Sequence, residues 1–88
     1  MSERRVDEAV RLLKTLVYDR EVYFDRTGHL NSEGMKVISR VARIIAEGLP
    51  EHLKVVKEAR SRRSYESILN LLERLSEQRS RSRNQGGF

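Results

Sequence analysis

Apolar residues recur at every third or fourth position through most of this 88-residue chain, and this spacing constrains its fold more than any other feature. Side chains three and four positions apart share one face of an α-helix, whereas a half-buried strand alternates with a period of two. A chain of this length supports one domain and buries only about 60–65% of its unfolded surface. The pattern therefore predicts an all-α fold, a small bundle of three to four helices. Because a bundle this small is only marginally stable alone, we expect a partner or self-association.

Polar capping residues mark where the first two helices begin. The first helix is expected from Ser2 to about Tyr18, and the second opens at Asn31 or Ser32. Residues 20–31 between them break the helical pattern and contain several β-forming side chains. They are expected to form an irregular loop, or a short β ribbon, whose aromatic residues fill the core.

The second helix is followed by Gly48-Leu49-Pro50. Glycine suits a left-handed cap and proline cannot continue a helix, so a third helix is expected to start at Pro50. Residues 60–64 then interrupt the apolar period, and Ser64 can cap a fourth helix. One long bent helix is the alternative, since no Gly or Pro lies between 51 and 85. Two helices are favoured.

The last ten residues differ in composition from the rest of the chain. They are basic and rich in Ser and Gly, which is typical of a segment that is disordered when free. The sequence thus predicts a helical domain over 1–78 and a flexible basic tail over 79–88. The predicted core consists of Val10, Leu13, Val17, Ile38, Val41, Ile45, Leu53, Val56, Ile68 and Leu72.

Composition and residue spacing argue against several functional classes. The chain has no cysteine, which excludes disulfides and Cys-based zinc sites. No apolar run approaches the ~18 residues of a membrane span, and the start resembles no signal peptide. His29 and His52 lack carboxylates at metal-ligand spacing, and no glycine-rich phosphate loop is present. We therefore expect a cytoplasmic, non-enzymatic protein without metal, cofactor, small-molecule substrate or membrane contact.

One segment, Gly28-His29-Leu30-Asn31-Ser32-Glu33-Gly34, resembles the last conserved block of the GDSL/SGNH esterases. In that family an Asp-x-x-His-x-Asn segment supplies the acid and the base of a catalytic triad. Here Arg26 stands three residues before the histidine, and Asp25 stands four before it. The resemblance implies an α/β sheet and a Gly-Asp-Ser nucleophile loop, and this chain has neither. A turn followed by a capped helix explains the shared residues, so no esterase activity is expected.

Basic residues are concentrated toward the end of the chain. Residues 57–88 hold eight Lys or Arg against four Asp or Glu, whereas residues 1–56 hold ten against nine. Arginine outnumbers lysine fourteen to four and makes forked contacts with phosphate, although a GC-rich or thermophilic genome gives the same bias. The excess predicts largely non-specific contact with the backbone of DNA or RNA. The candidate residues are Lys57, Arg60, Arg62, Arg63, Arg79, Arg81 and Arg83, with a second stripe of Lys36, Arg40 and Arg43.

The predicted fourth helix carries a second kind of candidate surface. Its apolar residues alternate at three and four positions over about two heptads, which is enough to dock on another helix. The candidate protein-interface residues are Tyr65, Ile68, Leu69, Leu72 and Leu75. A helix-turn-helix around residues 47–50 is a minor alternative. The sequence thus favours a non-enzymatic accessory subunit of a nucleic-acid-handling assembly, such as a ribosome or a DNA replication complex. The alternative is a helical adaptor or homodimerisation module that binds no nucleic acid.

Overall fold

Helices account for most of the chain in the computed structural model, which describes the backbone of residues 2–87 and the side chains of residues 5–77. The elements in order are α1 (Ser2–Tyr18), α2 (Arg20–Tyr23), α3 (Ser32–Gly48), the 3₁₀ turn η1 (Pro50–His52), α4 (Leu53–Arg62) and α5 (Tyr65–Gly87). The predicted all-α class is confirmed. No helix within the described part of the chain is long and apolar enough to cross a membrane.

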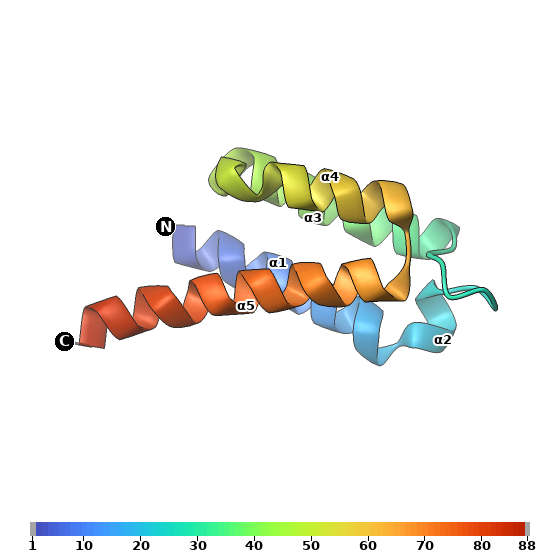
Figure 1. The fold of residues 1–88 in the computed structure, drawn as a ribbon, viewed down its shortest axis with the longest axis horizontal. Helices are drawn as coiled ribbons and strands as arrows, with labels where there is room; N and C mark the ends of the chain where they lie inside the picture. Colours follow the sequence, from blue (N-terminus) through green and yellow to red (C-terminus); the bar gives the residue numbers. More distant parts are fainter. Residues whose placement is uncertain (1, 88) are drawn as a thin grey trace.

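The four long helices run alternately up and down, so that each lies antiparallel to its neighbours (Figure 1). Helix α1 packs against α3 and α5, and α4 packs against the same two helices. The helices therefore form a closed ring in the order α1, α3, α4, α5. In such a ring the surface shared by α3 and α4, here named the α3–α4 face, lies opposite the surface shared by α1 and α5, named the α1–α5 face.

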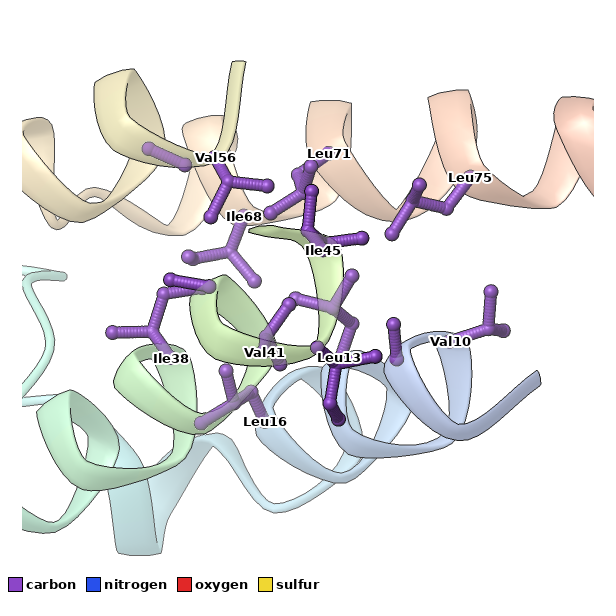
Figure 2. Close-up of a cluster of buried hydrophobic side chains, with 14 of the residues drawn as sticks. Val10, Leu13, Leu16, Ile38, Val41, Ile45, Val56, Ile68, Leu71 and Leu75 are labelled. Carbon is purple, nitrogen blue, oxygen red and sulfur yellow. The ribbon is translucent and has the colours of Figure 1, made fainter. Parts of the chain in front are cut away.

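Apolar side chains from all four long helices meet inside this ring (Figure 2). The largest fully buried ones are Val10, Leu13, Leu16, Ile38, Val41, Ile45, Val56, Ile68, Leu71 and Leu75. Most of the predicted core is confirmed, but Val17, Leu53 and Leu72 are only partly buried. Helix α5 has to face α1 and α4 at once, so its inward line is Ile68, Leu71 and Leu75 rather than a line centred on Leu72.

The segment between α2 and α3 is a tight turn that is tied to the junction between α4 and α5, at the same end of the bundle (Figure 1). Gly28 adopts a φ of 83°, which favours glycine over other residues. Two isolated bridges, Phe24 with Leu30 and His29 with Ser64, are the β-type pairings that the structure describes, and residues 2–87 contain no strand. The Leu30 amide donates to the Arg63 carbonyl at 2.8 Å, and the Tyr65 amide donates to the Gly28 carbonyl at 3.0 Å. The turn thereby fixes the junction between α4 and α5.

That junction confirms two helices where one long bent helix was the alternative. Arg63 has a φ of 60° and ends α4 in the left-handed conformation. The Ser64 hydroxyl then accepts a hydrogen bond from the Ser67 amide at 3.2 Å, as the sequence predicted for a cap. At the start of α3, the Asn31 side chain accepts from the Gly34 amide at 2.9 Å, which confirms that cap as well.

The predicted left-handed cap at Gly48 is wrong. Gly48 is the last residue of α3, and the chain leaves through Leu49 at a φ of −140°. Leu49 is buried, which draws the chain inward before Pro50 opens the 3₁₀ turn. A side chain at Gly48 would collide with Arg5 of α1. The glycine therefore serves the close approach of two helices rather than a turn.

The predicted boundary at residue 79 does not coincide with the end of a helix. The backbone of α5 remains helical to Gly87, and α5 extends past the N-terminal end of α1 (Figure 1). The prediction of a flexible tail over 79–88 is therefore not confirmed. No glycine precedes Gly86 in this segment, so no residue there stops the helix. The side chains of Arg79, Arg81 and Arg83 lie outside the described residues.

Candidate nucleic-acid interface

Helix α4 turns one edge toward α5 and the other toward α3. Val55, Glu58 and Arg62 line a groove of about 150 Å³ against α5. At 3.6 residues per turn, positions 57 and 60 lie roughly half a turn away from that edge. Lys57 and Arg60, both exposed, therefore border α3.

An ion pair and a shallow hollow show which edges of α3 lie near its neighbours. Arg40 lies 3.9 Å from Glu8 of α1, so that edge of α3 faces α1. Lys36, which shares the outward stripe of α3 with Arg40, lines a hollow together with Arg63. Arg43, seven positions after Lys36, continues the same stripe. Lys36 thus lies near the end of α4, and both Lys36 and Arg43 are exposed on the outward surface of α3.

Because α3 and α4 are antiparallel, these residues come together on the α3–α4 face. Lys36 and Arg63 lie at one end, and Arg43 and Lys57 lie toward the other, with Arg60 between them. All five side chains are exposed. We name these five residues the basic face.

Two of the acidic residues near the basic face are paired with arginines outside it. Glu47 pairs with Arg5 of α1 at 2.8 Å, and Glu58 pairs with Arg62 at 3.6 Å on the α5 side. Of the side chains that the structure describes, Glu33 is the one carboxylate that pairs with the basic face, 3.4 Å from Lys36. Arg43, Lys57, Arg60 and Arg63 form no ion pair among the described side chains. Their charge is therefore available to an external anion.

The structure does not bring all the predicted basic residues to one surface. Arg40 and Arg62 point to the α1 and α5 edges, where each has a carboxylate partner. Sequence reasoning also missed Lys54, which is exposed on α4 one turn before Lys57. The spacing of three between Lys54 and Lys57 is the signal that could have identified it.

The dimensions of the basic face suit a phosphate backbone. Lys36 to Arg43 spans about 10 Å of helix, and Lys57 to Arg63 spans about 9 Å. The two helix axes are expected to lie about 8–10 Å apart. Since phosphates of one strand follow one another every ~3.4 Å along a duplex, the face covers about three of them per strand.

The arrangement of α3 and α4 differs from a helix-turn-helix. Helices in that motif cross at roughly 90–120°, whereas α3 and α4 lie side by side and antiparallel (Figure 1). No single helix of the pair stands out from the bundle as a reader of bases. The basic face is a broad two-helix surface, which is suited to backbone contact.

The esterase-like segment forms a self-contained turn. One carboxylate oxygen of Asp25 accepts hydrogen bonds from the Thr27 amide at 2.9 Å, the Thr27 hydroxyl at 2.6 Å and the His29 amide at 3.1 Å. These bonds, above all the one from the Thr27 hydroxyl, lower the pKa of Asp25. Nδ1 of His29 lies 2.9 Å from the Thr27 hydroxyl oxygen, and all three residues are exposed. Asp25 therefore stabilises the turn, and Asn31 is occupied in capping α3.

The predicted protein-interface residues divide into two groups. Ile68 and Leu75 are fully buried between α5 and the other helices, so they are not available to a partner. Tyr65, Leu69 and Leu72 are partly exposed. The Tyr65 ring packs edge-on against Phe24 at 5.3 Å, and the Arg20 guanidinium lies over it at 4.2 Å.

Known proteins offer no relative from which a function could be taken. Comparisons with protein-family models, with curated proteins and with solved structures find no match to this chain. The described residues also hold no group of three His, Cys, Asp or Glu side chains that could bind a metal ion. The chemistry of the basic face is therefore the basis on which a function is inferred.

Proposed function

We propose that this protein is a non-enzymatic accessory subunit of a nucleic-acid-handling assembly and binds the phosphate backbone of DNA or RNA through its basic face. The observation that carries the proposal is the grouping on the α3–α4 face of four exposed cations that form no ion pair with any side chain the structure describes. The carboxylates of α3 and α4 have cationic partners. Arg79, Arg81 and Arg83 would add further contacts.

The physical reason is that unpaired, exposed cations gain most from a polyanion. Each phosphate contact releases condensed counterions, and log K against log salt falls by about 0.9 per contact on B-DNA. Arg43, Arg60 and Arg63 can also form forked hydrogen bonds with phosphate oxygens. Such contacts are insensitive to base sequence.

Fluorescence anisotropy with a DNA duplex and a structured RNA, each at several salt concentrations, tests the proposal. Four contacts predict a slope near −3.6 on B-DNA, before any contribution from residues 79–88. The double variant Arg43→Ser with Lys57→Ser should flatten the slope by about 1.8. Removing residues 79–88 should flatten it by a further 2 to 3 or so.

The matched control removes the same charge from another edge of the bundle. Arg5→Ser with Arg40→Ser also changes the net charge by two, but both residues pair with carboxylates at the α1–α3 boundary. This control should leave the slope nearly unchanged. A flat salt response of the wild type, or equal effects of the two double variants, would overturn the proposal.

The alternative of a helical adaptor draws on a different observation. Tyr18 is 77% exposed at the end of α1, and Leu69 and Leu72 of the neighbouring helix α5 are partly exposed. An adaptor would show no nucleic-acid binding above background at about 150 mM salt, where exposed charges are largely screened. Its arginines would then meet an acidic protein surface.

A further inference from the structure

The α1–α5 face carries an apolar strip along the line where the two helices meet. Ser67, Asn70 and Arg74 of α5 line the groove with α4, so the other edge of α5 borders α1. That other edge carries Leu72, which packs partly against the core, and Leu69, which is partly exposed. Val17, also partly buried, and the exposed Tyr18 lie opposite them on α1. The apolar strip is formed by Val17, Tyr18, Leu69 and Leu72.

Charged residues of opposite sign border the apolar strip. On α1, Arg11 and Lys14 lie on the same stripe as Tyr18, at spacings of seven and four. On α5, the outer row beside Leu69 consists of Glu66, Glu73 and Glu77. None of these five forms an ion pair among the described side chains. Asp7, the acidic member of the α1 stripe, already has an interaction within the chain.

This pattern is complementary to itself under one particular two-fold rotation. When two copies meet through the α1–α5 face about an axis parallel to the helices, α1 of each copy lies antiparallel on α5 of the other. The basic row of each copy (Arg11 and Lys14) then faces the acidic row of the other (Glu66, Glu73 and Glu77). The same two rows thus meet twice, as an isologous interface requires. An axis perpendicular to the helices would instead place α1 on α1 and set like charges opposite one another.

We propose that a second copy of this chain docks on the α1–α5 face in this arrangement, with the apolar strip between the two copies and Tyr18 at the end of that strip. In α1 and α5, Val10 lies near Leu75, so Lys14 lies at the level of residues 71 and 72 (Figure 2). Lys14 of one copy therefore meets Glu73 of the other, and Arg11 meets Glu77.

The area of the α1–α5 face gives an expected range for the dissociation constant of the dimer. Seventeen residues of α1 extend about 25 Å, and two helices side by side are about 20 Å wide. Each copy therefore buries roughly 500 Å², so the total is near the lower limit for a specific interface. A dimer of this size is expected to dissociate in the micromolar range.

Sedimentation velocity of the full chain without nucleic acid, from about 1 to 200 µM, tests the proposal. Arg11→Glu with Lys14→Glu makes both rows acidic, and Glu73→Lys with Glu77→Lys makes both basic. Each double variant alone should raise the dimer Kd by about tenfold or more through like-charge repulsion. An equimolar mixture should restore a heterodimer, because each basic row again faces an acidic one. Tyr18→Ser should weaken the wild-type dimer while the monomer stays folded, since Tyr18 is exposed.

The control introduces the same charge change on the opposite face. Arg43→Glu with Lys57→Glu should leave the dimer Kd unchanged, although it removes two members of the basic face. Dimerisation is thus measured independently of nucleic-acid binding, and either proposal can fail alone. A wild type that stays monomeric over the whole range, or a mixture of the two charge variants without heterodimer, would overturn the inference.

Discussion

Gly34 is a residue at which the surrounding packing leaves no room for a side chain. A Cβ there would lie 2.5 Å from the Tyr23 carbonyl oxygen and 2.6 Å from Cδ2 of Leu30. The Tyr23 carbonyl is held in place because it accepts a hydrogen bond from the Asn31 amide at 2.9 Å. The first turn of α3 therefore depends on glycine for close approach to the preceding loop.

Gly34→Ala should destabilise the protein although alanine is the better helix former. Overpacking costs about 1–3 kcal/mol, against a propensity gain of up to about 1 kcal/mol. We expect a net loss of about 1–2 kcal/mol, seen as a melting temperature lower by about 4–8 °C for each kcal/mol.

The matched control for this substitution is Gly48→Ala in the same helix. There the new methyl group meets the side chain of Arg5, whose 46% exposure allows it to move aside. Gly48→Ala should therefore cost less than Gly34→Ala. The opposite order in thermal melts would contradict the packing described around Gly34.

At the scale of elements, the orientation of α5 about its own axis decides which of its leucines are buried in the core and which are partly exposed. Leu71 is fully buried, whereas the adjacent Leu72 lies at the boundary with α1 and is partly exposed. Ser67, Asn70 and Arg74 mark the edge toward α4. The helix is therefore wedged between two neighbours, with Leu71 directed into the ring.

Leu71→Ala should cost about 2–5 kcal/mol of unfolding free energy, because a buried side chain is deleted and a cavity remains. Leu72→Ala, with the same chemistry one position along, should cost about half as much or less, since part of its surface is already in water. Urea titration at low micromolar concentration measures both variants as monomers. Equal losses would mean that α5 is rotated from the orientation described.

At the scale of the whole molecule, the basic face and the α1–α5 face lie on opposite sides of the ring. A dimer formed through the α1–α5 faces therefore exposes one basic face at each end. Such a particle can hold two segments of nucleic acid at once, whereas a monomer holds one.

Bridging is the expected consequence, and it depends on both proposals. Two duplexes labelled with a donor and an acceptor fluorophore should show energy transfer when the wild type is added. Tyr18→Ser leaves the charge of the protein unchanged, so it should still bind each duplex while energy transfer falls. Transfer that persists in Tyr18→Ser at concentrations where this variant is monomeric would show that bridging does not require the dimer.

The sequence by itself determined the features that depend on neighbours within about four positions. Asn31 and Ser64 were predicted as caps because a polar side chain next to an apolar period satisfies the free amides of the first turn. The break between α4 and α5 and the turn at Gly28 were predictable for the same local reason. The number and order of the long helices follow from these signals.

Only the tertiary structure decided the features that depend on which helices become neighbours. Gly48 looked like a left-handed cap, yet burial of Leu49 and the approach of Arg5 keep it helical. Sequence spacing alone could not separate Leu71 from Leu72, since the apolar face of α5 is broader than the line that the ring encloses. Likewise, Arg40 and Arg43 belong to one stripe in the sequence, and only the position of α1 gives the first a partner and leaves the second on the basic face. Long-range contacts select among the residues that local periodicity leaves equivalent.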